Sequence, residues 1–222
     1  GLDASLPKLT EVEGDFLMPI FTNIGANKAD RYMETGLRHQ THIFDDGSIV
    51  NELTLTRRNN FNNDVLAWLK KTTAEYGFTT WSDHLEGVAG ASDSRTGIRL
   101  YIPEGSALLE TRGILRDEIQ FFYDPAQDLS YYYIDQTLAP GEEKTITLLY
   151  TLPWSFRGSF KEHSFHLFKQ PGLKNISVEK TLTAANELLL SSTPLPTETR
   201  DEMDYVLQSP FKNDLAMKWL FH

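Results

Sequence analysis

Histidine is the residue type in this sequence whose spacing bears most directly on metal binding and acid–base chemistry. Six histidines occur, at positions 39, 42, 84, 163, 166 and 222. His39 and His42 are three residues apart in a predicted strand, as are His163 and His166, and such side chains point to opposite faces. Neither pair can converge on one metal ion, and a tetrahedral site would need side chains from distant strands. We therefore interpret the histidines as surface or boundary residues and predict no metal ligands.

Nucleophilic catalysis and phosphate binding have characteristic motifs, and this sequence lacks them. Residues 90–94, Gly-Ala-Ser-Asp-Ser, come nearest to a Gly-x-Ser-x-Gly elbow but lack the second glycine. A Gly-x-x-x-x-Gly-Lys phosphate loop does not occur either. The sequence therefore predicts no catalytic residue and no cofactor of these kinds.

Acidic residues are numerous, yet their positions define no site. A carboxylate pair of the glycosidase type cannot be assigned, because the candidates are close in sequence with no known distance in space. These candidates are Asp83, Glu86, Asp93, Asp117 and Glu118. Calcium stays open as a cofactor, because the turns at 45–46 and 124–128 carry aspartates, although aspartate also favours turns for its own hydrogen bonds.

Aromatic side chains form the remaining candidate site. Tyr131 and Tyr133 are expected on the face of their strand opposite the core. Together with three tryptophans they could stack against a sugar or a partner protein. The tryptophans are Trp68, Trp81 and Trp154. In the alternative interpretation, a second sheet or the apolar side chains of Val65, Trp68 and Leu69 cover the tyrosines.

Composition limits the class of protein. The chain has 222 residues, 40% of them apolar, and can bury a sizeable core. Acidic residues outnumber Lys and Arg by 31 to 21, and the net charge of -10 argues against a nucleic-acid partner. The absence of cysteine excludes disulfides and thiolate sites. No apolar run reaches the ~18 residues of a membrane helix, and the opening Gly-Leu-Asp leads us to expect a fragment or a processed product.

A hairpin around residues 45–47, Asp-Asp-Gly, is the clearest local element. We expect a three-residue loop with Gly47 in the left-handed region, because a two-residue turn would mix polar and apolar side chains on each face. The favoured register pairs Ile43 with Ile49, His39 with Leu53 and Leu37 with Leu55.

Residues 60–96 interrupt the β pattern. The cap cluster at 62–64 and the helical spacing of apolar residues up to Tyr76 predict a helix of about three turns that stops at Gly77. A second, weaker helical turn is predicted over 80–86, with Thr80 or Ser82 as its cap.

Strands follow one another from residue 98 onward. The best defined pair, 128–138 and 144–152, flanks a Pro-Gly turn and is expected to present one shared inward face. That face consists of Tyr132, Ile134, Leu138, Ile146, Leu148, Tyr150 and Leu152.

The fold class follows from these elements. Roughly ten to twelve short strands predict a mainly β fold, an antiparallel β-sandwich or two stacked β-sandwich subdomains, with a small helical insertion. We expect residues 1–153 to form the sandwich with its insertion at 60–96. Residues 154–222 would complete the sandwich or form a second small β subdomain, with any boundary near 152–158.

Several motifs occur in an order typical of one family. They are Asn-x-x-x-Asn-Lys-x-Asp-x-Tyr at 23–32, Asp-Gly at 46–47, Leu-Thr-Leu-Thr-Arg-Arg-Asn at 53–59, Arg-Leu-Tyr-Ile-Pro-Glu-Gly-Ser at 99–106, Pro-Gly-Glu at 140–142 leading into 148–153, and Lys-Gln-Pro-Gly at 169–172. Together they resemble the C-terminal part of the bacterial "domain of unknown function 4012" family. The resemblance implies a large envelope protein with an upstream membrane anchor and an extracytoplasmic C-terminal part, and it implies no reaction. The Gly-rich upstream segment of the family is missing, and the insertion at 60–96 is longer than the resemblance implies.

We therefore predict a non-enzymatic, extracytoplasmic structural or interaction module of a bacterial cell-envelope protein. Its expected partner is an envelope protein or a glycan, with membrane contact only through the upstream anchor. A carbohydrate-binding module that uses exposed aromatics is the first alternative. A domain of a cell-wall polysaccharide enzyme is the second.

Overall fold

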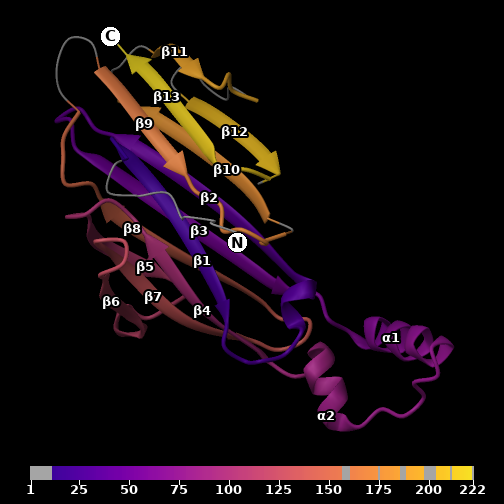
Figure 1. Cartoon of the computed structure of the whole chain (residues 1–222). Helices are drawn as coiled ribbons and strands as arrows, with labels where there is room; N and C mark the ends of the chain where they lie inside the picture. Colours follow the sequence, from indigo (N-terminus) through magenta and orange to yellow (C-terminus); the bar gives the residue numbers. More distant parts are fainter. Residues whose placement is uncertain are drawn as a thin grey trace.

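The computed structural model describes residues 12–156, 161–174, 176–185, 189–197, 204–210 and 212–221. Two sheets lie face to face in this part of the chain, and a small helical insertion extends from one end (Figure 1). The mainly β sandwich predicted from the sequence is confirmed. His222 lies outside the described residues, as do residues 157–160 of the expected boundary region.

The first sheet has seven strands. In spatial order they are β11 (Leu189–Thr193), β13 (Leu215–Phe221), β9 (Lys161–Leu167), β1 (Asp15–Asn23), β4 (Ser94–Tyr101), β7 (Leu129–Leu138) and β6 (Ile119–Asp124). The second sheet has six. Their order is β12 (Asp204–Pro210), β10 (Ile176–Ala184), β2 (Met33–Ile43), β3 (Ile49–Asn59), β8 (Glu143–Thr151) and β5 (Ala107–Arg112).

The sheets are mixed, so the expectation of a purely antiparallel sandwich is wrong. β1 pairs with β9 in parallel, and β2 pairs with β10 in parallel. Each parallel pair joins an early strand to a late one, and short turns cannot make such connections. Strands that follow residue 153 therefore enter both sheets: β9, β11 and β13 in the first, β10 and β12 in the second.

The first hairpin has the predicted register. Ile43 lies opposite Ile49, His39 opposite Leu53 and Leu37 opposite Leu55. Gly47 has a φ of 80°, which places it in the left-handed region that the three-residue loop requires. The alternation puts Leu37, Leu53 and Leu55 into the core.

The predicted pairing of 128–138 with 144–152 is wrong. β7 pairs with β4 and β6 in the first sheet, whereas β8 pairs with β3 and β5 in the second. The Pro-Gly turn between them therefore crosses from one sheet to the other. The predicted inward face is nevertheless buried, because side chains that meet across a sandwich alternate in the same way as side chains paired within one sheet.

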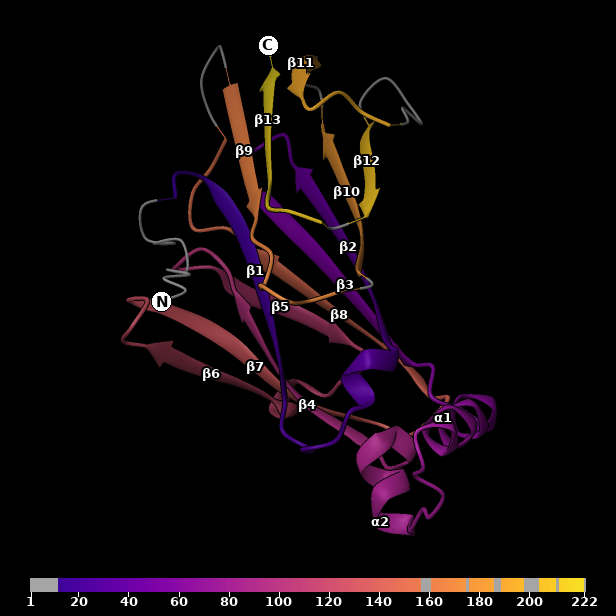
Figure 2. The same ribbon diagram turned by 45° about the vertical axis from the view of Figure 1, so that its right-hand side comes forward.

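The helical insertion forms where it is predicted. Helix α1 (Asn63–Glu75) begins at Asn62, whose side chain accepts a 2.9 Å hydrogen bond from the backbone N–H of Val65. Helix α2 (Asp83–Glu86) is capped by Ser82, one of the two predicted caps. The insertion projects from the end of the sandwich (Figure 2) and neither helix buries a residue. The alternative that Val65, Trp68 and Leu69 cover the sheet is therefore wrong.

Two glycines with positive φ provide a matched test of backbone packing. A Cβ at Gly113, which follows β5, would lie 2.1 Å from the carbonyl oxygen of Thr145, whereas one at Gly141 would meet no atom within 4 Å. We expect Gly141→Ala to lower the free energy of unfolding by about 1 kcal/mol through φ strain alone. Gly113→Ala should cost about 3 kcal/mol or more, because strain and a backbone clash combine. Urea unfolding of both variants checks this, and equal losses would contradict it.

Candidate functional site

Tyr131 and Tyr133 lie on the outer face of the first sheet, as predicted, since the intervening Tyr132 faces the core. Phe122 of the edge strand β6 joins them, with ring centroids 5.8 Å from Tyr131 and 6.0 Å from Tyr133. The Arg99 guanidinium lies 5.5 Å from the centroid of the Tyr131 ring. These four residues, Arg99, Phe122, Tyr131 and Tyr133, form what we call the tyrosine surface. Aromatic faces beside a cationic side chain are suited to stacking against a sugar ring or a planar group.

Two of the three predicted tryptophans, Trp68 and Trp81, lie elsewhere. Trp68 is on α1, Trp81 precedes α2, and Trp154 follows β8. Tyr131 pairs with Tyr101 at the end of β4, whereas the helical insertion leads into the other end of that strand at Ser94. The structure therefore brings the two tyrosines together and places Trp68 and Trp81 at the opposite end of the sheet.

The helical insertion, residues 63–86, is an exposed arm with its own small set of contacts. Trp81 donates a 3.2 Å hydrogen bond from Nε1 to the Thr73 hydroxyl and packs edge-on against Phe78. Lys70 forms an ion pair with Glu86 and so links α1 to α2. Large apolar side chains remain exposed. They are Trp68, Tyr76, Phe78 and Leu85, of which Tyr76 is 86% exposed.

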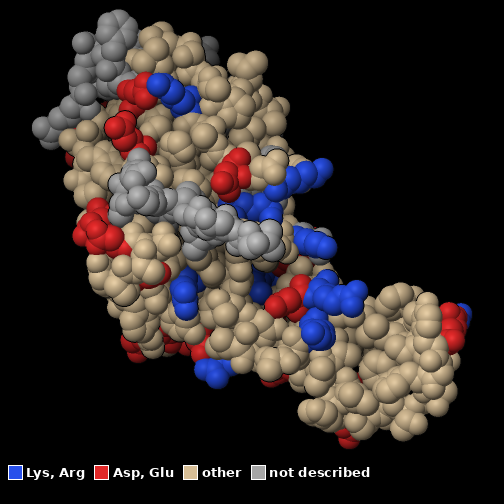
Figure 3. Space-filling view, in the orientation of Figure 1, with Lys and Arg blue, Asp and Glu red and all other residues tan. Residues whose placement is uncertain are grey.

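Few charged side chains are visible on the face of the arm shown in Figure 3, and they lie at its margins. The sandwich in the same view carries many more acidic and basic side chains. The face of the arm that this view shows is therefore largely uncharged.

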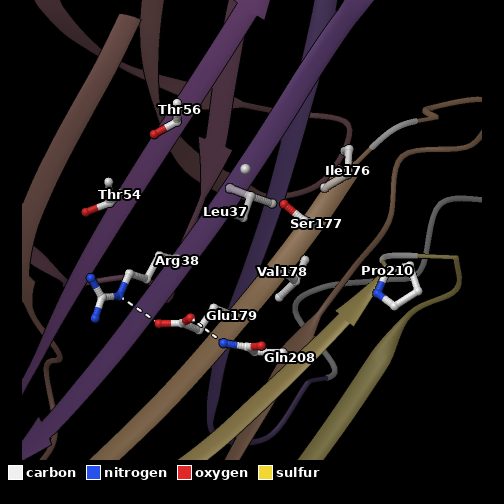
Figure 4. Close-up of a pocket in the computed structure, with 11 residues that line it drawn as sticks. Leu37, Arg38, Thr54, Thr56, Ile176, Ser177, Val178, Glu179, Gln208 and Pro210 are labelled. Carbon is white, nitrogen blue, oxygen red and sulfur yellow. Dashed lines mark hydrogen bonds and ion pairs between the residues drawn. The ribbon is translucent and has the colours of Figure 1, made fainter.

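A shallow hollow of about 680 Å³ lies on the outer face of the second sheet (Figure 4). The hollow lies over Gly36 of β2 and Ser177 of β10, because glycine has no side chain and the side chain of serine is small. At one end of the hollow, Glu179 forms a 2.9 Å ion pair with Arg38 and accepts a 2.9 Å hydrogen bond from the side chain of Gln208. Among the described residues that line this hollow, Glu179 is the one carboxylate, and it is already paired on both sides.

A second hollow of about 610 Å³ lies near the Lys-Gln-Pro-Gly motif. Its described lining includes Arg57, which is buried and donates a 3.0 Å hydrogen bond to Gln136. Asp30 is the one carboxylate among the described residues that line it. Among the described lining residues, therefore, neither hollow has the two carboxylates that a glycosidase uses.

A network of polar side chains lies inside the core, where the sequence indicated none. Lys180 of β10 is fully buried, its Nζ 2.7 Å from Nδ1 of His39 and in contact with the Thr41 hydroxyl. Its Nζ also lies 4.2 Å from the centroid of the Phe165 ring and 5.8 Å from that of Trp219.

The network continues towards the first sheet. Thr41 donates a 2.6 Å hydrogen bond to Oδ1 of Asn51, whose Nδ2 donates a 2.9 Å bond to Oδ2 of Asp15 on β1. His163 Nε2 lies 3.9 Å from the same carboxylate oxygen. All of these side chains are less than 4% exposed.

Burial shifts the ionisation of this network. It raises the pKa of Asp15 to about 6 and lowers that of Lys180 to about 7, because each charged form loses its hydration. Burial, and secondly the charge of Lys180, lowers the pKa of His163 to about 3. His163 is therefore neutral at pH 7, and its contact with Asp15 is not an ion pair.

The prediction that the two histidines of each pair point to opposite faces is confirmed. The prediction that the histidines are surface or boundary residues is wrong for His39 and His163. His39 and His163 are buried, whereas His42 and His166 lie on the outer faces. The two buried histidines occupy inward strand positions that the alternation marks, since His39 was paired with Leu53 on the apolar face. No signal in the sequence indicated that Asp15, Asn51 and Lys180 would join them, because these residues are more than 30 positions apart.

Metal and membrane features were also sought in the described residues. No group of three or more His, Asp or Glu is arranged there to hold a metal ion. The turn aspartates considered for calcium are engaged locally: Asp46 accepts from the Ser48 N–H at 2.8 Å and Asp124 from the Tyr101 hydroxyl at 2.6 Å. Among the described helices, none combines the length and apolar character needed to cross a bilayer.

Solved structures similar to this chain are found at low sequence identity. A candidate nutrient-binding protein from Legionella pneumophila superposes with a TM-score of 0.51 and 9% identity, covering 93% of this chain and 71% of that protein. An M1 zinc metallopeptidase from Deinococcus radiodurans gives a TM-score of 0.36 and 11% identity, covering 85% of this chain and 42% of the peptidase. No family model and no curated protein matches the chain. The likeness to the Legionella protein shows the sandwich fold alone.

Burial of neutral His163 predicts a pH dependence of stability. Because its pKa is about 3 in the fold, against 6.5 for a histidine in the unfolded chain, unfolding takes up a proton as the pH falls below 6.5. The contribution of His163 to stability should therefore fall between pH 6.5 and 3, by at most about 1.4 kcal/mol per pH unit. Asp15, whose pKa burial raises from 3.8 to about 6, contributes in the opposite sense between those two values. His163→Phe should lose the histidine contribution, so that its stability falls less towards low pH than that of wild type, and His166→Phe on the outer face serves as the control. Chemical unfolding across the acidic range up to neutral pH measures this, and identical profiles for wild type and His163→Phe would refute it.

Proposed function

We propose that this chain is a non-enzymatic interaction module of an extracytoplasmic bacterial envelope protein and that the helical arm is its protein-binding surface. The supporting observation is that α1, a helix of 13 residues, buries no side chain. Isolated helices of this length are marginal in water. A partner that covers Trp68 and Tyr76 would supply the apolar burial that the arm lacks.

The chemistry of the arm favours a protein partner. Tryptophan and tyrosine are the residues most often central to protein interfaces. Exposed apolar patches on soluble domains mark contact sites. The extracytoplasmic location is supported by the resemblance to the domain of unknown function 4012 family, and a membrane helix encoded upstream in the parent reading frame is the expected confirmation.

Substitution of the two large exposed aromatic side chains of the arm tests this function. We expect Trp68→Ser and Tyr76→Ser to weaken binding by about tenfold or more, since they remove central apolar contacts. The partner would be captured from the envelope fraction, identified, purified and titrated by calorimetry. Trp154→Ser, which removes an exposed tryptophan of the sandwich, should bind like wild type. Equal affinity of the arm variants and wild type would reject the arm as the binding surface.

The tyrosine surface supports a second candidate function, carbohydrate binding. Tyr131 and Tyr133 are half-buried and Phe122 is exposed on this outer face, and Arg99 adds hydrogen-bond donors beside them. Sugars bind to such surfaces by stacking their apolar faces on the rings.

Calorimetric titration with cell-wall glycan fragments tests this second candidate. Tyr131→Ala should weaken a saturable signal by about tenfold. Trp68→Ala, on the helical arm at the opposite end of the sheet, should leave it unchanged. No heat from any glycan with the folded wild-type chain would reject it.

A further inference from the structure

The core network brings together an amine, a carboxamide and a carboxylic acid from three strands. Lys180 comes from β10, Asn51 from β3 and Asp15 from β1, and each is fully buried. We propose that Lys180 Nζ and Asn51 Cγ join in an intramolecular isopeptide bond, with Asp15 transferring the proton and ammonia leaving. This inference rests on the core alone and is independent of the proposed function.

A single hydroxyl separates the amine from the carboxamide. Thr41 contacts Lys180 Nζ and donates a 2.6 Å hydrogen bond to Asn51 Oδ1. The lysine side chain is a flexible four-carbon stem, so Nζ can leave the Thr41 contact and move onto Asn51 Cγ. Thr41 then continues to donate to Oδ1, the atom on which negative charge develops during attack.

Asp15 is placed at the leaving group. Its Oδ2 accepts a 2.9 Å hydrogen bond from Asn51 Nδ2, the nitrogen that must depart as ammonia. Its Oδ1 is buried and makes no hydrogen bond to the described residues. A buried carboxylate with an unsatisfied oxygen is costly, whereas a protonated carboxyl group in the same place can act as a proton donor.

The surroundings favour the neutral, reactive forms. Phe165 and Trp219 flank the amine, and His39 Nδ1 lies 2.7 Å from it. Burial lowers the pKa of Lys180 to about 7 and raises that of Asp15 to about 6. A substantial share of the lysine is therefore an uncharged nucleophile at neutral pH, as attack on a carbonyl carbon requires.

The step balances without any further reactant. The Lys180 lone pair forms the Nζ–Cγ bond, and the carbonyl π electrons move to Oδ1. Asp15 gives a proton to Nδ2 and receives one from Nζ. The electron pair on Oδ1 returns, the Cγ–Nδ2 bond breaks, and ammonia leaves with Asp15 back in its initial state.

Positioning and burial both drive this reaction. Well-oriented intramolecular groups reach effective concentrations on the order of 10⁵–10⁸ M. The product amide carries no charge, so the lysine ammonium no longer has to be kept in an apolar core. The bond would tie β3 to β10 across β2. It would also close the chain between residues 51 and 180.

The intact mass of the folded wild-type chain tests the proposal directly. We expect a mass about 17 Da below that of the sequence, equal to one ammonia. Trypsin should not cut after Lys180, and peptide 39–57 should appear linked to peptide 175–200. The full sequence mass, or separate peptides ending at Lys180 and containing unmodified Asn51, would overturn the proposal.

Single substitutions test which two residues form the bond. Lys180→Met and Asn51→Ala should each keep the full mass of their sequence. A deficit that persists in either would overturn the proposal, because it would then arise from another asparagine. Lys218→Met, at an exposed lysine on β13, is the matched control and should retain the deficit and the linked peptides.

Asp15→Asn tests the proton transfer separately, because it leaves the amine and the carboxamide in place. We expect this variant to keep its full mass while unfolding cooperatively by circular dichroism. A 17 Da deficit, about one ammonia, in Asp15→Asn would overturn the role of Asp15. Should this variant not fold, the wild-type mass and the Lys218→Met control still decide the bond.

Discussion

Lys180 places its amine nitrogen inside the apolar core, and the interior of the sandwich is arranged around that constraint. A buried polar group is tolerated only when it has partners. His39, Thr41 and the ring faces of Phe165 and Trp219 supply them from three other strands. Some inward positions that would otherwise hold leucine or valine are therefore occupied by side chains that contact the lysine nitrogen.

The need to surround the buried lysine amine with partners also explains why the parallel strand pairs matter. The parallel pairs β1–β9 and β2–β10 bring residues near the start of the chain beside residues near its end. Asp15 and Lys180 are each placed by one of these pairs. The polar network therefore lies where the early and late strands meet.

Surface features are separate from this core. The helical arm lies in the chain between β3 and β4, whereas the tyrosine surface lies on the outer face of β4, β6 and β7. Neither feature is needed to fill the core. Function generally lies in sites added to a fold and not in the fold itself, and the arm and the tyrosine surface are additions of this kind.

The sequence by itself determined the elements and their inward faces. The Gly47 loop fixed the register of β2 and β3, Asn62 and Ser82 marked the helix starts, and alternation identified Tyr150 as inward and Tyr131 as outward. These signals are local, because they depend on φ preferences, capping and a two-residue period. Tertiary structure decided the rest: that β7 and β8 belong to different sheets, that the arm projects, and that Asp15, Asn51 and Lys180 meet. Strands with the same alternation can pair within a sheet or face each other across a core, and only the packing of the whole chain chooses between these arrangements.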